Sequence, residues 1–206
     1  AVPSAILANL KNHSDLGFHG GLLDDAVMDL IELGVVNGSR KEIDRGEHII
    51  GMALGSEKML NWLAANRKAE NVVFKSANYT HDINIISRLE NFVSINSAVQ
   101  VDLFGQVNAE MVGARQISGT GGSVDFMRSA SASRGGRSIV ALTASAKDGK
   151  ISKIVPKVDF VTALRTDVDT IVTEYGVAEI KNCSLEERAN KLIEIADPLH
   201  REELRK

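Results

Sequence analysis

The chain has 206 residues, of which 44% are hydrophobic, and its formal net charge is −3. A chain of this size can bury a sizeable core without metals or disulfides. Its mild acidity argues against nucleic acid or an anionic membrane as the main partner. The single Cys183 cannot form an internal disulfide, and no apolar run approaches membrane-spanning length. We therefore expect a cytoplasmic globular protein.

The first half of the sequence predicts alternating helices and strands. Pro3 and Ser4 open a short helix, because proline is tolerated in a first turn. Asp24 and Asp25 are suited to cap a second helix, which Gly34 ends in a left-handed conformation. The other expected elements are strands over 17–19, 48–54 and 71–75, and a helix over 56–66 with Leu60 and Leu63 inside.

The second half begins with a stretch that is richer in strands. Strand-like sequence covers 92–105 and 108–118, and a glycine loop then leads into a helix over 124–131. Further strands are expected over 138–144 and 169–176. The last clear helix starts at Ser184, where Glu187 completes a capping box, and the inward positions of this helix are Leu185, Ala189, Leu192 and Ile193.

This order of elements predicts an α/β fold. Apolar strands that alternate with helices favour a largely parallel sheet covered by helices on both faces, and the strand-rich middle makes the sheet mixed. The sequence shows no internal repeat and no convincing linker between domains, so we expect a single domain over 1–206.

The stretch LGFHGGLLDDAV, residues 16–27, has the pattern of a strand, a tight turn and a helix. Such a turn usually carries a reactive side chain at its tip. Here the tip is Gly20-Gly21, which has no side chain. The pattern has two interpretations: an active site that lacks its nucleophile, or a tight turn with a structural role only.

A second glycine-rich stretch, QISGTGGSVDF, lies between a predicted strand and a predicted helix. The N–H groups of Gly119, Gly121 and Gly122 can approach an anion there, where the helix dipole favours negative charge. The alternative is a tight turn without a ligand. Lys147 in SAKDGK is a second candidate for an anion contact, against the simpler interpretation of a solvated turn lysine.

Two histidines are candidate functional groups. His81 follows Thr80, a residue type suited to the N-cap, so we expect His81 in the first turn of a helix, where a neutral imidazole is favoured as a hydrogen-bond donor. The simpler interpretation is a surface histidine. His19 is either a base or ligand, or a structural histidine. No second histidine or cysteine stands at ligand spacing, so we expect no metal site.

Three further polar residues have two interpretations each. Asp102 and Gln106 in VDLFGQVN either line a pocket or cap backbone donors at a turn. Glu174 in TEYGVA has the same two interpretations.

Taken together, the segments resemble the acetyl-CoA hydrolase/transferase family, in particular the C-terminal domain of its 4-hydroxybutyrate CoA-transferase type. The resemblance runs in order along nearly the whole chain. Its opening AVPSAILANL is similar to the end of the family's N-terminal half, which implies that the family's N-terminal domain is absent from this chain. The matching stretches are LGFHGGLLDDAVMDLIELGVVNG, SINSAVQVDLFGQVNAE, QISGTGGSVDF, SAKDGKISKIVP, VTEYGVA and REEL.

The resemblance implies an enzyme that moves coenzyme A from a short-chain acyl-CoA to a carboxylic acid of the acetate, butyrate or 4-hydroxybutyrate class. In the family a glutamate attacks the thioester, forms a mixed anhydride and becomes a glutamyl-CoA thioester. Oxyanion donors stabilise each acyl-transfer step. The resemblance assigns one donor to the backbone of Gly122, and it implies that Lys147 lies near the CoA phosphates, with Gly119 and Gly121 in the same binding loop.

The chain departs from the family at two positions that carry the chemistry. The family's turn reads His, Ser or Thr, Glu, Met, and an ungapped match puts Gly21 at the position of the nucleophilic glutamate. An asparagine donor of the family corresponds to His81. Asp25 matches a family aspartate, and Asp24 is an extra carboxylate three positions from Gly21.

These departures keep three hypotheses open. The first is an enzyme whose carboxylate comes from Asp24, from the missing N-terminal half or from a second copy in a homo-oligomer. This first hypothesis includes an acyl-CoA hydrolase, with His19 or His81 as base. The second is a CoA-binding or assembly module without catalysis. The third is a fragment that cannot work without its other half.

Overall fold

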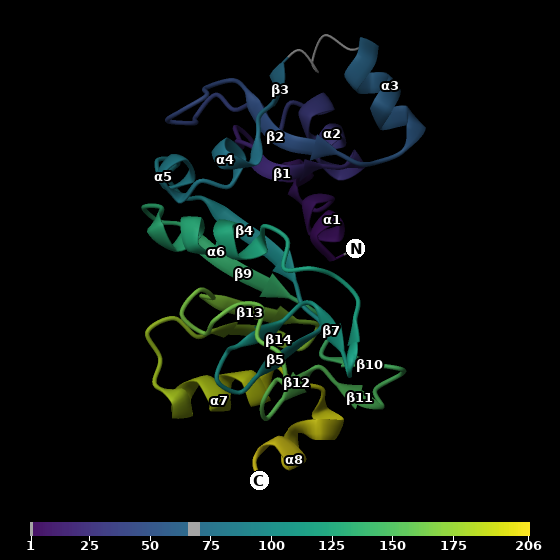
Figure 1. Ribbon diagram of the computed structural model, residues 1–206, viewed down its shortest axis with the longest axis vertical. Helices are drawn as coiled ribbons and strands as arrows, with labels where there is room; N and C mark the ends of the chain where they lie inside the picture. The colour runs from purple at the N-terminus through teal and green to yellow at the C-terminus, as the bar shows by residue number, and fades with distance from the viewer. Residues whose placement is uncertain (1, 66–70) are drawn as a thin grey trace. The chain divides into compact units, whose positions relative to one another are not determined.

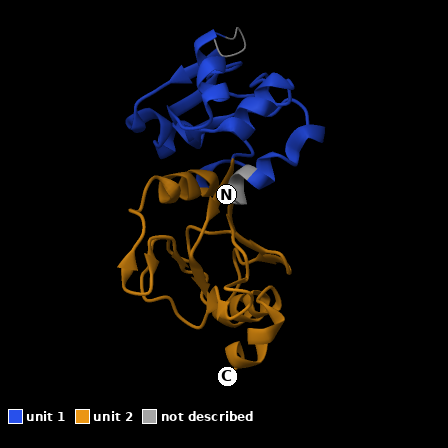
Figure 2. Cartoon of the chain, turned by 90° about the vertical axis from the view of Figure 1, so that its right-hand side faces the viewer, with its two compact units in different colours: residues 1–92, 132–135 blue, residues 93–131, 136–206 orange. Residues whose placement is uncertain are grey.

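The computed structural model describes residues 2–65 and 71–206. These residues divide into two compact units, one made of 1–92 and 132–135 and the other of 93–131 and 136–206 (Figure 2). We refer to them as unit 1 and unit 2. The expectation of a single domain stays a prediction.

Unit 1 is built on a parallel sheet with the strand order β1-β2-β3 (Figure 1). The strands are β1 (His19–Leu23), β2 (His48–Ala53) and β3 (Val72–Phe74). The helices described in this unit are α1 (Val2–Leu7), η1 (Leu10–Asn12), α2 (Asp25–Glu32), α3 (Glu57–Ala65), α4 (Ala77–Thr80) and α5 (Ile83–Ile86).

Helix α2 follows the sequence prediction closely. The Asp24 carboxylate accepts a hydrogen bond of 3.1 Å from the backbone N–H of Val27, which satisfies one of the donors that a helix start leaves unpaired. Val27, Leu30 and Ile31 are buried in the core of unit 1. Gly34, with φ of +74°, follows the helix in the left-handed region.

Helix α3 forms where it was predicted, but it buries different residues. Met59 and Trp62 face the core, whereas Leu60 is 52% exposed, so the prediction for Leu60 is wrong. Leu63 is partly buried and packs against the core. Each buried residue, Met59 and Trp62, lies one position before a residue that was predicted to be buried. Their spacing of three residues puts both on the same face of the helix. Asn66, the predicted last residue, lies outside the described residues.

Unit 2 contains several sheets rather than one. A four-stranded sheet has the order β14-β13-β9-β4, and all of its pairs are parallel except β13 with β14. Its strands are β4 (Val93–Ser97), β9 (Arg137–Ala141), β13 (Thr170–Thr173) and β14 (Gly176–Glu179). A smaller sheet joins β12 (Ile154–Val155), β5 (Gln100–Asp102) and β6 (Val107–Asn108).

Two antiparallel pairs and four helical segments complete the description. The pairs are β7 (Met111–Val112) with β8 (Arg115–Gln116), and β10 (Ser145–Ala146) with β11 (Ile151–Ser152). The helical segments are α6 (Ser123–Ala132), which is mostly in unit 2, α7 (Leu185–Glu194), η3 (Pro198–His200) and α8 (Arg201–Leu204).

Helix α7 begins with the predicted capping box between Ser184 and Glu187. Leu192 and Ile193 are buried as expected and Ala189 is partly buried, but Leu185 is 48% exposed. Arg188 is buried instead. Its guanidinium donates hydrogen bonds to three backbone carbonyls, those of Cys183, Phe104 and Arg165, and this explains how a charged side chain can occupy an inward position.

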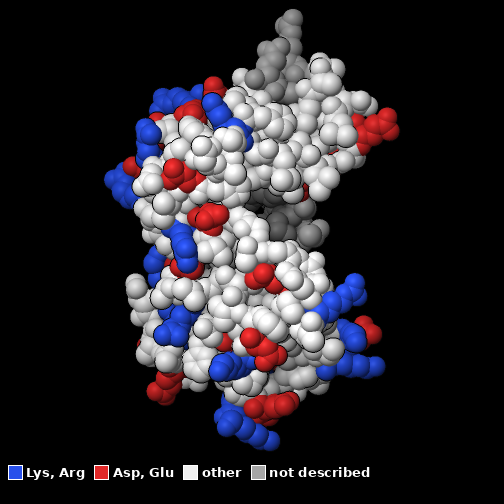
Figure 3. Space-filling view, viewed as in Figure 1, with Lys and Arg blue, Asp and Glu red and all other residues white. Residues whose placement is uncertain are grey.

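The predicted α/β class is confirmed, with parallel pairs joining the longer strands. None of the helices in the described ranges is both long enough and apolar enough to cross a membrane. Acidic and basic side chains are interspersed over the face shown in Figure 3. That face carries no extended surface of a single sign.

Candidate active site

The glycine pair lies inside a strand and not at the tip of a turn. Strand β1 runs from His19 to Leu23, and Gly20 pairs with Ile50 of β2. The prediction of a turn at Gly20-Gly21 is therefore wrong. Glycine is usually a poor strand residue, but parallel pairing with β2 keeps these two glycines in a strand. Alternation along β1 puts His19 and Gly21 on the same face of the sheet.

Strands β1 and β2 approach each other closely at Gly21. A Cβ added to Gly51 of β2 would lie 3.1 Å from the carbonyl oxygen of Gly21 and 3.5 Å from the hydroxyl of Thr80. Gly51 therefore lies next to both the strand that carries Gly21 and the end of α4. Unit 1 thus places Gly21 near the Thr80–His81 segment.

His19 is a buried histidine in this region. Its Nε2 lies 3.2 Å from the carbonyl oxygen of Thr80, which assigns the ring proton to Nε2, and Nδ1 has no hydrogen-bond partner in the described part of the chain. Burial, and then the charge of Lys41, lower the pKa of His19 to about 4. Its geometry corresponds to the interpretation as a structural histidine, since the residue is 6% exposed and its ring is hydrogen-bonded to a backbone carbonyl.

Lys41 is a residue that the sequence interpretation missed. Its side chain is buried, and Nζ donates hydrogen bonds to the carbonyl oxygens of Phe18, at 3.3 Å, and Glu47, at 2.7 Å. These two residues immediately precede β1 and β2. Burial lowers the pKa of Lys41. Burial, and then the positive charge of Lys41, lower the pKa of His48 to about 4. No local pattern in the sequence signals a buried lysine.

His81 lies at the end of a helix, whereas we predicted the start of one. It is the C-cap residue of α4, and its backbone N–H donates to the carbonyl oxygen of Ala77 at 3.0 Å. The N-cap of the next helix is Asp82, which accepts a hydrogen bond from the N–H of Asn84. The predicted effect of a helix N-terminus on His81 therefore does not apply. Nδ1 of the His81 ring lies 2.8 Å from Thr80 Oγ1.

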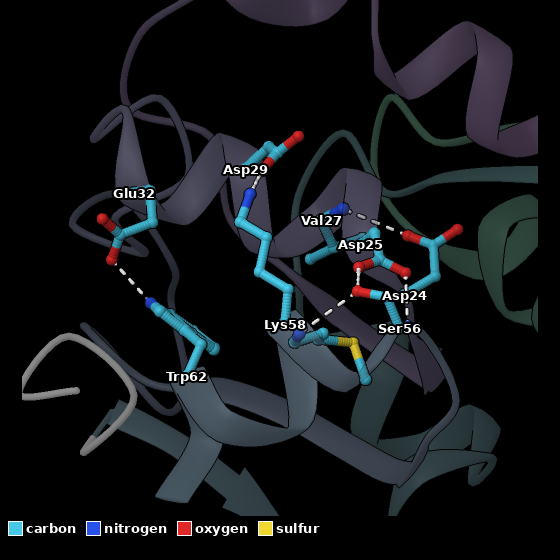
Figure 4. Close-up of polar contacts among 9 residues, drawn as sticks. Asp24, Asp25, Val27, Asp29, Glu32, Ser56, Lys58 and Trp62 are labelled. Atoms are coloured by element: carbon cyan, nitrogen blue, oxygen red, sulfur yellow. Dashed lines mark hydrogen bonds and ion pairs between the residues drawn. The ribbon is translucent and has the colours of Figure 1, made fainter. Parts of the chain in front are cut away.

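The two aspartates that follow β1 both have structural contacts (Figure 4). Asp24 caps α2, and Asp25 accepts hydrogen bonds from the backbone N–H and the hydroxyl of Ser56. The bonds from Ser56 lower the pKa of Asp25. A hollow of about 390 Å³ lies beside them and is lined by Ala8, Lys11, Asp24, Asp25, Ala26, Asp29 and Leu30.

The second glycine stretch connects β8 to α6, as the sequence predicted. The carbonyl oxygen of Gly122 accepts a hydrogen bond of 3.3 Å from the N–H of Phe126, so the helix begins directly after this loop. Gly121 has φ of +57°, a conformation that other residues rarely adopt. An added Cβ at Gly119 or Gly121 would meet no atom within 4 Å, so the loop has open space around it.

Lys147 lies in the exposed turn between β10 and β11, with φ of +51°. In the residues that the structure describes, no hydrogen bond or ion pair joins it to the glycine loop. Unit 2 thus contains Gly119, Gly121, Gly122 and Lys147, and unit 1 contains Gly21 and His81.

The remaining polar candidates cap backbone groups. Asp102 is fully buried and accepts hydrogen bonds from the N–H groups of Phe104 and Gln106 and from the Gln106 side chain. Glu174 accepts a bond of 2.8 Å from the N–H of Ala144. Within the described ranges, no cluster of three His, Cys, Asp or Glu side chains is placed to hold a metal ion.

Known proteins resemble the chain over its full length. The profile of the acetyl-CoA hydrolase/transferase C-terminal domain matches residues 55–206. The 4-hydroxybutyrate coenzyme A transferase of Clostridium kluyveri is 43% identical over 99% of this chain and 48% of its own length. The butyryl-CoA:acetate CoA-transferase of Anaerostipes caccae is 41% identical over 92% of this chain and 43% of its own length.

A solved structure shows the same fold. RipA from Yersinia pestis superposes with a TM-score of 0.94 at 40% identity, over 100% of this chain and 46% of the RipA chain. The present chain spans about half the length of the curated relatives it matches. By its profile and by the identity with these relatives, the chain belongs to the acetyl-CoA hydrolase/transferase family.

Proposed function

We propose that the protein containing this chain is a CoA-transferase-type enzyme, which moves coenzyme A between a short-chain acyl-CoA and a carboxylic acid of the acetate, butyrate or 4-hydroxybutyrate class. The observation that carries this proposal is the match of 92–99% of this chain to CoA-transferases, at 41–43% identity. A cytoplasmic location and assembly with a further half or a second copy belong to the same proposal.

In this proposal His81 and Gly122 are the oxyanion donors. The tetrahedral intermediate of acyl transfer places negative charge on the former thioester oxygen, and a positioned N–H stabilises that charge. The backbone N–H of His81 donates to the carbonyl oxygen of Ala77, and its Nδ1 is hydrogen-bonded with Thr80 Oγ1. Gly122 immediately precedes α6, where a backbone N–H is a candidate donor. A side-chain donor and a backbone donor are thus both available from this chain.

Coenzyme A would bind to unit 2. The loop of Gly119, Gly121 and Gly122 precedes a helix of ten residues, whose dipole favours an anion at its start. The absence of side chains lets a ligand approach the backbone there. Lys147 in its exposed turn would contact the CoA phosphates as a solvated cation.

Gly21 occupies the position of the family's nucleophilic glutamate in this proposal. The neighbouring carboxylates are poor substitutes, because Asp24 caps α2 and Asp25 is bonded to Ser56. We infer that the attacking carboxylate comes from outside these 206 residues. Its oxygen attacks the thioester carbon, the C–S bond breaks, and the CoA thiolate then attacks the resulting anhydride to release the first acid.

The alternatives are direct hydrolysis and CoA binding without turnover. A hydrolase needs a base for water, and His19 is a weak candidate because it is buried with a pKa of about 4. His81 is the better candidate, since it is only partly buried. A binding module remains consistent with the missing side chain at Gly21.

The test uses the complete protein with butyryl-CoA and acetate. Acetyl-CoA formation, together with borohydride reduction of a carboxylate in the presence of acyl-CoA, supports covalent transfer. CoA release that does not depend on acetate supports hydrolysis. Calorimetric binding of CoA without either product supports the binding module and refutes the enzyme. The variant Gly21→Glu would gain transferase activity if the rest of the site is competent.

A further inference from the structure

The hydroxyl of Thr80 lies between two potential hydrogen-bond acceptors. Thr80 is fully buried at the end of α4. Its Oγ1 is 2.8 Å from Nδ1 of His81 and 3.4 Å from the carbonyl oxygen of Ser76. The position of one proton therefore decides which ring nitrogen of His81 is protonated.

The carbonyl of Ser76 is already occupied. It accepts backbone hydrogen bonds from Tyr79, at 2.9 Å, and from Thr80, at 3.1 Å. A carbonyl oxygen has two lone pairs, so a third donor at 3.4 Å gains little there. Of the two acceptors, His81 Nδ1 is the nearer and the less occupied, which favours donation from the Thr80 hydroxyl to the ring.

A ring nitrogen that accepts a hydrogen bond carries no proton, so the neutral ring is protonated at Nε2. We propose that Thr80 is a positioning residue that fixes His81 as the Nε2–H tautomer, so that an imidazole N–H takes the place of the amide donor of the family's asparagine. The inference rests on the proposed function, in which His81 stabilises the oxyanion.

Two further hydrogen bonds hold the peptide group between Thr80 and His81. The carbonyl oxygen of Thr80 accepts the bond from His19 Nε2, and the next backbone N–H, that of His81, donates to Ala77. Gly51 of β2 lies next to the hydroxyl, which is 3.5 Å from the position of an added Cβ. Hydrogen bonds therefore hold the backbone on both sides of this peptide group.

The tautomer can be measured without any enzymatic assay. In the complete protein labelled with ¹⁵N-histidine, at pH 8, we expect His81 to show a protonated Nε2 and an unprotonated Nδ1. Thr80→Val keeps the branched shape but removes the hydroxyl, so both ¹⁵N shifts should move toward the average of the two tautomers. Thr80→Ser should restore the wild-type shifts. Thr80→Ala is the second variant if valine is not tolerated, and His81→Asn assigns the signals.

His200 is the internal control, because its Nε2 is 2.8 Å from the carbonyl oxygen of Gly149 in unit 2. Its shifts should be the same in all variants. Unchanged His81 shifts in both Thr80→Val and Thr80→Ala would overturn the inference, whatever the activity of the protein.

Kinetics then separate this inference from the proposed function. Loss of a well-directed donor lowers kcat, so we expect Thr80→Val to reduce kcat by about tenfold with little change in KM for the acyl-CoA, and Thr80→Ser to recover it. If the ¹⁵N shifts move and kcat does not, the tautomer assignment stands and the oxyanion role of His81 in the proposed function is refuted.

Discussion

The phenol of Tyr79 donates a hydrogen bond to the carboxylate of Asp44, with its oxygen 2.9 Å from each carboxylate oxygen. Burial, followed by this bond, raises the pKa of Tyr79. Asp44 lies in the loop before β2, and Tyr79 lies in α4, one residue before Thr80. The bond therefore ties this loop to the helix that carries the Thr80–His81 pair.

Replacing Tyr79 by phenylalanine should weaken unit 1. The variant leaves the Asp44 carboxylate without its donor, and we expect a loss of about 1–2 kcal/mol in the free energy of unfolding. Trp62, the single tryptophan, lies in unit 1 and reports its unfolding in urea by fluorescence. Tyr175→Phe, at an exposed tyrosine of unit 2, is the control, and an equal loss in both variants would contradict a specific role for the Tyr79–Asp44 bond.

Unit 1 should lose stability as the pH falls from 6.5 toward 4. His19 and His48 have a pKa of about 4 in the folded chain, against 6.5 as the ordinary value. Between these values the unfolded chain binds a proton that the folded chain does not, so each buried histidine contributes on the order of 2 kcal/mol that disappears over this window.

The measurement is urea unfolding followed by Trp62 fluorescence at pH 7.5, 6, 5 and 4.5. His48→Gln should flatten the decline with falling pH, because one of the two titrating groups is gone. His13→Gln, at an exposed histidine, should leave the slope as in the wild type. Parallel slopes for all three proteins would show that these buried rings do not control the acid sensitivity.

The inner face of α3 can be tested with two adjacent residues. Met59 has no exposed surface and Leu60 is 52% exposed. Met59→Ala should cost about 2–5 kcal/mol, because it leaves a cavity, whereas Leu60→Ala should cost roughly 0.5 kcal/mol or less. Thermal unfolding followed by circular dichroism ranks the two, and the reverse order would place α3 in a different rotation.

A methyl group added at Gly51 should lower the stability of unit 1. In Gly51→Ala the new Cβ would lie 3.1 Å from the Gly21 carbonyl, which belongs to the backbone of a paired strand and cannot easily move. We expect a loss of about 1–3 kcal/mol in the urea experiment. Gly119→Ala, which meets no atom within 4 Å, should leave the stability nearly unchanged, and similar losses for the two would argue against crowding at Gly51.

The elements that could be predicted are those whose signals are local. The Asp24 cap of α2 and the Ser184–Glu187 capping box of α7 depend on residues within one turn of each other, and both form as expected. The fold class follows from the alternation of apolar strands and helices. The glycine loop before α6 was likewise visible, because its flanking strand and helix are adjacent in sequence.

The errors arise where distant residues decide the local structure. The Gly20-Gly21 pair has a low strand propensity, and only pairing with β2, some thirty residues later, makes it a strand. The residue type of Thr80 predicts an N-cap, but Thr80 is the last residue of α4, because threonine is compatible with both positions.

Lys41 links the starts of the parallel strands β1 and β2. Antiparallel strands are aligned by the hairpin turn between them, but parallel strands have no such turn. Lys41 binds the carbonyls of the residues just before both strands and packs so close to Gly17 that an added Cβ there would lie 2.7 Å from its Cγ. A slip of one residue would turn His19 and Gly21 to the other face of the sheet and separate the ammonium from its acceptors. The Lys41 ammonium thus favours the observed alignment of two strands that are distant in sequence and have no connecting turn to align them.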